Sequence, residues 1–306
     1  MRYLENSNGP TSQPCDDGSS TRREVRGAFA GERLVAIAKS RRSGTARRQS
    51  NSADLGPMGD YVAHLEAALA ASGWPKGKRT RFRLKIAAVS VLAEVGYQDL
   101  KVSDICEQAE VALGTFYTYF TDKSEIAAEV LLDFTDDLYE QGRSAARGAS
   151  DYQAILRTNQ FFAAAYQRNS GLVRCLVQLE DMVADFRSRV REKRLFWLKK
   201  IARSLARRTG HPDVSNALFL QIAYALEGMV FTYLYDTFVR REPVLNRQAG
   251  GSDRIADLLS VLWYRATYCE DPPDNEVRHA REALGMRRES TTKTVTKATR
   301  SLRRSS

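Results

Sequence analysis

The sequence has few of the residues from which metal sites, disulfide frameworks and catalytic centres are usually built. Its 306 residues include three histidines and four widely spaced cysteines, with no CxxC pair. Disulfide scaffolds and zinc sites need closer and more numerous cysteines. No HExxH, GxSxG, GxxxxGK(S/T) or GxGxxG motif occurs, and the carboxylates are scattered. We therefore expect a protein of a reducing cytoplasm that is not an enzyme and that holds no metal or cofactor.

Long hydrophobic runs are also missing. No segment reaches the roughly 18 consecutive apolar residues of a membrane-spanning helix, and the first residues contain no apolar stretch of the signal-peptide type. Hydrophobic residues still make up 43% of the chain, which is enough for a core. We expect a soluble, cytoplasmic protein without a membrane partner.

Positive charge is in excess and is concentrated in two places. The formal net charge is +10, which favours a polyanionic partner such as double-stranded DNA. Residues 286–306 hold seven Lys or Arg residues against the single acid Glu289, and residues 76–85 hold six and no acid. The first of these segments has almost no apolar surface to bury. We therefore interpret residues 271–306 as a basic disordered tail.

The first part of the chain predicts little structure. Residues 1–57 are rich in Gly, Ser, Arg and Pro. We interpret residues 1–75 as a mostly disordered N-terminal extension, in which residues 60–71 can form a short helix before a Gly-Trp-Pro breaker. Met58 is an alternative start, which would leave residues 1–57 outside the natural protein.

Helical periodicity becomes clear at Leu84. Apolar residues recur from there on one helical stripe, and Gly96 is placed to end that helix. The pattern then predicts two short helices, over 102–109 and 112–120, joined by a tight turn. Three helices in so short a segment, with a tight turn between the last two, predict a helix-turn-helix DNA-binding domain over 76–126.

The rest of the chain predicts longer helices. Asp122 is placed to cap a fourth helix that starts near Lys123. Apolar stripes then continue, separated by clusters of Gly, Asn and Pro, over 151–168, 171–186, 187–208, 213–240 and 253–269. No strand pattern is present. The sequence therefore predicts an all-α protein in which a C-terminal helical domain covers 127–270.

The predicted helix-turn-helix segment resembles the N-terminal domain of TetR-family transcriptional regulators. Residues 80–126 align with that family's pattern without a gap, and the matching residues are Ala87, Ala88, Gly96, Tyr97, Val102, Asp104, Ile105, Ala109, Val111, Gly114, Thr115, Tyr117, Phe120 and Lys123. The resemblance implies a third helix that enters the DNA major groove, with one face packed and the other against DNA. It also implies a C-terminal ligand-binding and dimerisation domain.

The aromatic segment 114–120 suits this division of faces. Phe116 and Phe120 are four residues apart, so we expect both to pack, on Leu92 and Ile105. The residues that we expect at DNA are Arg79, Arg81, Lys101, Ser103, Leu113, Gly114, Thr115, Tyr117, Thr118, Tyr119 and Lys123. A solvated basic run is the alternative for the arginines, and plain exposure is the alternative for Thr118 and Tyr119.

The recognition helix departs from the family pattern at its start. Glu110 replaces the usual turn glycine, which would cost about 1 kcal/mol at a positive φ. Ala112 and Leu113 replace more usual polar residues, which disfavours a direct contact with guanine and favours contact between Leu113 and a thymine methyl group. We expect these departures to change the operator sequence and not the fold.

Two further sets of residues follow from the resemblance. The candidates for lining a ligand pocket are Phe161, Phe162, Tyr166, Met182, Phe186, Trp197 and Tyr224, with Glu227 either orienting a ligand or pairing with an Arg. The candidates for a twofold interface are Phe231, Leu234, Leu258, Leu262 and Trp263. Plain core packing is the alternative for both sets.

The resemblance thus predicts a sequence-specific DNA-binding regulator. We expect a ligand-responsive repressor that acts as a homodimer on an inverted-repeat operator and binds a small apolar or aromatic ligand. A dimer is favoured because one such headgroup makes too few contacts for specific affinity. The alternative is a DNA-binding protein of the nucleoid type that responds to no small molecule, and the basic tail suits either function.

Overall fold

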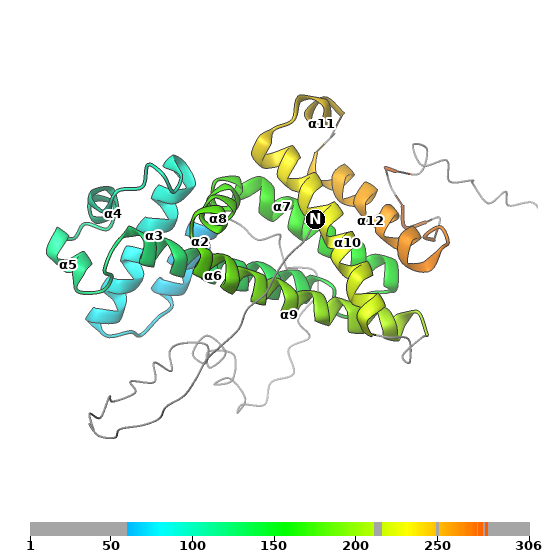
Figure 1. The fold of residues 1–306 in the computed structure, drawn as a ribbon, viewed down its shortest axis with the longest axis horizontal. Coiled ribbons are helices and arrows are strands. Elements are labelled where there is room, and N and C mark those ends of the chain that lie inside the picture. The colour runs from blue at the N-terminus through cyan, green and yellow to red at the C-terminus, as the bar shows by residue number, and fades with distance from the viewer. Residues whose placement is uncertain (1–59, 211–215, 249–250, 274, 278, 281–306) are drawn as a thin grey trace, which may run out of the picture. The chain divides into compact units, whose positions relative to one another are not determined.

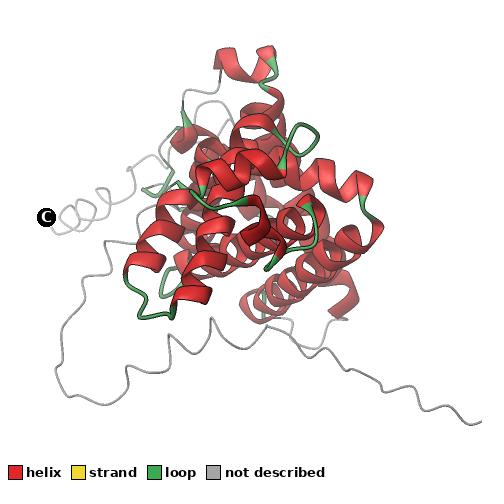
Figure 2. Cartoon of the chain, turned by 90° about the vertical axis from the view of Figure 1, so that its left-hand side faces the viewer, coloured by secondary structure: helices red, strands yellow, loops and turns green. Residues whose placement is uncertain are grey.

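The computed structural model describes residues 60–210, 216–248, 251–273, 275–277 and 279–280, and every regular element within these ranges is a helix (Figure 2). The predicted all-α fold is confirmed. The interpretations of residues 1–57, Met58 and 286–306 lie outside the described residues. The elements labelled in Figure 1 are α2 (Tyr61–Ala70), α3 (Lys76–Val95), α4 (Val102–Gln108), α5 (Leu113–Tyr117), α6 (Lys123–Ala145), α7 (Asp151–Arg168), α8 (Ser170–Met182), α9 (Ala184–Arg208), α10 (Asn216–Tyr235), the π-helical turn η1 (Asp236–Arg240), α11 (Pro243–Gln248) and α12 (Ser252–Tyr268).

The helices α3, α4 and α5 form the predicted helix-turn-helix unit. Gly96, at φ +85°, ends α3, and its N–H donates to the carbonyl of Leu92 at 3.0 Å. The recognition helix α5 is shorter than predicted. The helix ends at Tyr117, but Thr118 keeps helical backbone angles and the N–H of Phe120 bonds the carbonyl of Phe116 at 3.0 Å, which keeps both rings on the packed face.

The helix α6 packs against helices of both parts of the structure. The carboxylate of Asp122 caps its start by accepting from the N–H groups of Ser124 and Glu125, as predicted. Residues of α6 contact α3 on one side and α7, α8 and α9 on the others (Figure 1). One helix is therefore shared by the helix-turn-helix unit and the C-terminal helices.

The C-terminal helices pack mainly in two pairs, α7 with α12 and α9 with α10. The predicted break between residues 186 and 187 is wrong. The helix α8 ends at Met182 because Val183 adopts extended backbone angles, φ −124° and ψ 106°, and α9 begins at Ala184. The sequence pattern also missed α11 and the π-helical turn that follows α10.

Two predicted boundaries need correction because buried residues lie beyond them. The helix α2 belongs to the core and not to a disordered extension, since Tyr61 and Leu65 are buried, α2 packs on α3, and the centroid of the Tyr61 ring lies 5.0 Å from that of Phe134 on α6. At the other end, Val277 and Ala280 are buried although they fall in the predicted tail. The buried carboxylate of Asp257 accepts the N–H groups of His279 and Ala280, both at 2.7 Å, and so fixes this segment on α12.

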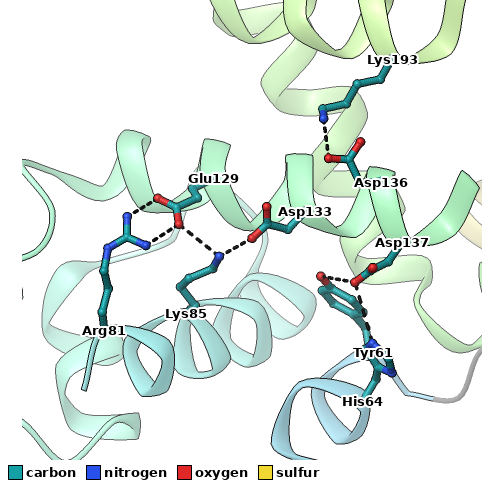
Figure 3. Close-up of polar contacts among 9 residues, drawn as sticks. All are labelled: Tyr61, His64, Arg81, Lys85, Glu129, Asp133, Asp136, Asp137 and Lys193. Atoms are coloured by element: carbon teal, nitrogen blue, oxygen red, sulfur yellow. Dashed lines mark hydrogen bonds and ion pairs between the residues drawn. The ribbon is translucent and has the colours of Figure 1, made fainter. Parts of the chain in front are cut away.

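Acidic residues of α6 hold three neighbouring helices (Figure 3). From α3, Arg81 forms a bidentate pair with Glu129 at 2.5 and 2.6 Å, and Lys85 bonds both Glu129, at 3.1 Å, and Asp133. From α9, Lys193 pairs with Asp136 at 2.5 Å. From α2, the phenol of Tyr61 donates to Asp137 at 3.2 Å. The contact between α6 and α3 is the strongest of the three, because it joins two cations to two carboxylates. The Lys85 side chain in this contact is only 10% exposed.

The pKa values of two carboxyl groups in this network, Asp137 and Glu129, are shifted in opposite directions. Burial raises the pKa of Asp137, and this effect outweighs the charge of His64 and the hydrogen bond from Tyr61, which act in the opposite direction. Burial alone would also raise the pKa of Glu129, but the hydrogen bonds and charges of Arg81 and Lys85 outweigh it and lower that pKa. Ionised Asp137 therefore costs stability, whereas ionised Glu129 contributes stability that is lost as the pH falls below its ordinary value of 4.5.

The variants Asp133→Asn and Asp137→Asn make the same chemical change four residues apart on α6, with different expected results. Asp133→Asn should lower the free energy of unfolding by roughly 1–2 kcal/mol, because the nearly buried ammonium group of Lys85 loses one of its two carboxylates. Asp137→Asn keeps an acceptor for Tyr61 and removes a disfavoured charge. It should leave stability unchanged or raise it by up to about 1 kcal/mol. Urea unfolding at pH 7 and one fixed protein concentration measures both values.

Wild-type protein unfolded over a pH series is the control for this pair of variants. Its stability should fall as the pH drops below 4.5, the ordinary pKa of Glu129. Equal destabilisation by the two variants would contradict the assignment of Asp133 as the partner of Lys85.

Candidate functional site

The recognition helix α5 presents an exposed face above a buried aromatic one. Phe116 and Phe120 are buried, with ring centroids 5.7 Å apart, in the same core cluster as Leu92 and Ile105. On the opposite face Leu113 is 52% exposed and Tyr117 is 56% exposed. The predicted packing of Phe116 and Phe120 is confirmed, and contact of the opposite face with DNA stays a prediction.

The turn before α5 adopts the strained geometry that the sequence predicted. Glu110 has φ +53°, the left-handed region that glycine normally occupies. The guanidinium of Arg83, on α3, donates to the carbonyl of Ala109 at 2.7 Å and reaches the Glu110 carboxylate at 3.4 Å. Arg83 therefore stabilises the turn that positions α5. Sequence reasoning had placed it only in the basic run.

Two of the predicted DNA contacts are occupied by contacts within the protein. The guanidinium of Arg81 is paired with Glu129 and lies 4.6 Å from the centre of the Phe120 ring, so its donors point into the domain. The ammonium group of Lys123 donates to the carbonyls of Gln98 and Leu100 at 3.2 and 2.9 Å. The geometry does not support Arg81 as a phosphate contact. A phosphate contact by Lys123 stays a prediction, and its one remaining donor would have to make it.

The other predicted contacts differ in exposure. Arg79, Lys101, Ser103, Gly114 and Thr118 are exposed, whereas Thr115 and Tyr119 are half-buried. Ser103 and Thr118 already donate locally, to Asp104 and to the Gly114 carbonyl. A Cβ atom added at Gly114 would meet nothing within 4 Å, so this glycine leaves the outer surface of α5 open.

A cavity of about 630 Å³ lies among α6, α7, α8, α9, α10 and α12. This volume falls in the range of small-molecule sites. Five of the eight residues predicted for a ligand pocket line it, namely Phe162, Tyr166, Trp197, Tyr224 and Glu227. The other three do not. Phe161 and Phe186 are buried in the core, and Met182 is 57% exposed at the end of α8.

An ion pair and two phenols are among the polar groups that line the cavity. Glu227 accepts three hydrogen bonds from the guanidinium of Arg194, at 2.5, 3.1 and 3.1 Å, which decides between the two predicted roles of Glu227 in favour of the ion pair. Burial raises the pKa of both Tyr139 and Tyr166. Within the described residues neither phenol makes a hydrogen bond, so both remain available to a ligand.

The residues predicted for the twofold interface are divided by the structure. Phe231, Leu234 and Trp263 line the cavity, and Leu234 is fully buried. Leu234 therefore cannot reach a partner chain. Leu258 and Leu262 are half-buried on α12.

The outer face of α10 is more open than the predicted interface residues. Leu218 is 50% exposed, and the small residues Ala225 and Thr232 are also exposed. By length and composition alone residues 217–240 would be able to cross a membrane, yet only 28% of their most apolar window is buried within the chain. This helix carries more apolar surface than the protomer covers.

Metal binding has no support in the described part of the chain, where no group of three or more His, Cys, Asp or Glu residues is placed to hold an ion.

The sequence model for "Bacterial regulatory proteins, tetR family" matches residues 86–130. These residues run from α3 through the turn and α5 into α6, so the match covers the exposed recognition face and the helix that supports it. The helix-turn-helix unit is a TetR domain. In this TetR domain Glu110 occupies the strained turn position at which glycine is usual.

Two named regulators are similar to this chain over part of their length. The fatty acid metabolism regulator protein of Bacillus subtilis is 32% identical over 122 residues, 38% of this chain and 62% of that protein. The transcriptional repressor DhaR of a Mycobacterium species is 35% identical over 81 residues, 26% of this chain and 40% of that protein. The chain thus spans less than two thirds of the length of either relative.

Solved structures share the arrangement of the TetR domain and the helical C-terminal domain. A TetR-family regulator from Mesorhizobium loti superposes with a TM-score of 0.51 at 17% identity, covering 62% of this chain and 98% of that one. GusR from Salmonella enterica superposes with a TM-score of 0.52 at 16% identity, covering 65% and 100%. At these identities the likeness concerns the fold.

The variant Tyr117→Phe tests the exposed face of the TetR domain. The Tyr117 hydroxyl makes no hydrogen bond within the described residues, so its loss should leave the melting temperature unchanged. If the hydroxyl bonds a DNA phosphate, affinity should fall by roughly three- to tenfold, and similarly for every operator variant. Fluorescence anisotropy with labelled DNA measures the change.

The companion variants separate the roles of Lys123. Lys123→Ala should lower the melting temperature, since it removes the hydrogen bonds to the carbonyls of Gln98 and Leu100. If Lys123 also binds a phosphate, the variant should reduce the slope of log DNA affinity against log salt concentration by about one. Tyr233→Phe, on α10, is the control and should not change DNA affinity. Wild-type affinity in both Tyr117→Phe and Lys123→Ala would exclude this face as the DNA contact.

Proposed function

We propose that the protein is a ligand-responsive transcriptional repressor that binds an inverted-repeat operator as a homodimer. The observation that carries the proposal is the TetR domain with Leu113 and Tyr117 exposed on α5 and an aromatic core beneath them. A surface of this kind suits major-groove contact, in which phosphate contacts position the helix and base contacts specify the sequence.

The shared helix α6 supports a response to ligand. Its first half holds the TetR domain through Glu129 and Asp133, and its second half lines the cavity with Leu138, Tyr139 and Arg143. A ligand that prefers one position of α6 would shift the population of the DNA-binding form by the difference in its affinity for the two positions. The names of the two relatives, a metabolism regulator and a repressor, agree with such a role.

The outer face of α10 supports a homodimer. Its exposed apolar and small residues would let a second copy of the helix approach closely, and they explain an apolar helix that the protomer leaves largely uncovered. We therefore propose that α10 lies in a dimer interface and not in a membrane, and that the protein is cytoplasmic.

A nucleoid-type protein without a small-molecule response is the second candidate. The net charge of +10 suits it equally, since sequence-independent DNA binding depends on charge. The cavity and the helix that it shares with the TetR domain favour the regulator.

The variant Gly228→Leu tests the dimer without threatening the fold. A Cβ atom at Gly228 meets nothing within 4 Å in the protomer, and Leu is a better helix former than Gly by roughly 0.5–1 kcal/mol. The variant should melt as a folded protein, yet it should dissociate towards monomer and bind operator DNA at least tenfold more weakly. Light scattering and anisotropy measure the two effects.

The matched control is Gly73→Leu, which places the same side chain in equally open space between α2 and α3. It should remain dimeric and keep its operator affinity. A dimeric Gly228→Leu protein with wild-type operator affinity would show that this face of α10 is not the interface.

A further inference from the structure

The cavity is long and narrow because it follows one face of α9. The residues of α9 that line it extend from Arg187 to Arg208. At 1.5 Å per residue this stretch is about 30 Å long. A cavity of only about 630 Å³ spread over that length is a channel, which suits an extended chain better than a compact ring system.

The middle of the channel is apolar. Its walls come from six different helices and include Leu138, Phe162, Leu176, Ile201, Val230 and Trp263. Burying an alkyl chain here would contribute about 0.8 kcal/mol per methylene group. The channel therefore favours a ligand with a long hydrocarbon chain.

One end of the channel carries surplus positive charge. We call this end the basic mouth, and it consists of the lining residues Arg143, Lys200 and Arg208, with Arg147 beside them through its ion pair with Glu140. Four cations here face two carboxylates: Arg143 and Arg147 share Glu140, and Arg208 pairs with Asp151. Lys200 has no ion pair within the described residues and lies 4.1 Å from the centre of the Phe196 ring. The surplus is two positive charges.

The titration of Glu140 agrees with this excess. The hydrogen bond from Arg143 lowers the pKa of Glu140, and the charges of Arg147 and Lys200 act in the same direction. The other end of the channel differs, because there Arg187 and Arg191 are balanced by Glu180 and Asp181. A charged head group is therefore favoured at one end only, and its charge is negative.

We infer that the channel binds a long-chain amphiphile with an anionic head group, with the head at the basic mouth and the chain along α9. The inference rests on the proposed function and names the ligand class of its cavity. A carboxylate and a phosphorylated carrier joined to the chain both supply the required negative charge. Either would gain charge-assisted hydrogen bonds from Lys200 and the neighbouring arginines.

Intrinsic fluorescence provides a direct binding assay, since two of the three tryptophans, Trp197 and Trp263, line the channel. The full-length protein is titrated, below micelle formation, with octanoate, laurate and palmitate, and with palmitoyl-coenzyme A and coenzyme A alone. Affinity should rise by up to about fourfold for each added methylene group. Hexadecyltrimethylammonium has a similar chain and a cationic head, and it should bind at least tenfold more weakly than the tighter of the two palmitoyl probes.

Adjacent lysines on α9 provide matched variants. Lys200→Glu should weaken binding of the tighter palmitoyl probe by roughly tenfold or more. Lys199→Glu makes the same charge change one residue away, on an exposed side chain outside the channel lining, and should leave the affinity unchanged. Circular dichroism melting confirms that both variants fold.

Palmitate binding more tightly supports a free carboxylate head, and palmitoyl-coenzyme A binding more tightly supports a phosphorylated one. The inference is overturned if hexadecyltrimethylammonium binds as well as both palmitoyl probes, if chain length has no effect, or if Lys199→Glu and Lys200→Glu weaken binding equally. Coenzyme A alone binding as tightly as palmitoyl-coenzyme A also overturns it. Operator binding by the unliganded protein is measured separately, so failure of this inference leaves the proposed regulator intact.

Discussion

The ion pairs between α3 and α6 are the contacts on which the rest of the arrangement depends. Arg81 and Lys85 hold Glu129 and Asp133 along one face of α6, and Lys85 is nearly buried where it does so. Breaking a pair of this kind leaves a poorly solvated charge, so α3 and the first half of α6 should move as one body. Because α3 also holds the turn before α5 through Arg83, the position of the recognition helix follows the position of α6.

The same helix reaches the channel at Thr135, within one turn of its last ion pair with α3 at Asp133. Tyr139 and Arg143 also line the channel. Just before them on α6, Asp136 pairs with Lys193 of α9 and Asp137 accepts a hydrogen bond from Tyr61 of α2. A head group at the basic mouth would compete with Glu140 for Arg143, at the end of α6 farthest from the TetR domain. The proposed regulation therefore needs no contact between ligand and DNA. It needs two positions of α6 that the ligand and the operator prefer differently.

Local sequence patterns predicted the fold and the recognition face but not the long-range pairs. The four-residue spacing of Phe116 and Phe120 was sufficient to place both rings in the core, because a helix repeats its faces over that spacing. Arg81 was assigned to DNA because its partner Glu129 lies 48 residues away, where no pattern joins them.

Leu234 was assigned to an interface for a related reason. Its apolar side chain is equally suited to a partner helix and to a cavity, and only the packing of α10 on its neighbours decides. Val277 lay in a segment whose composition suggested disorder, and one buried carboxylate, Asp257, holds the next residues in place.

Selection of bound duplexes from a random DNA library, with purified full-length protein at physiological salt, tests the central claim most directly. A TetR domain displayed twice by a homodimer should enrich one half-site that recurs as an inverted repeat at a constant spacing. The affinity of the enriched site should exceed that of random DNA by at least about a thousandfold. Recovery of DNA without a shared sequence, with binding that depends only on salt, would contradict the account and favour a nucleoid-type protein.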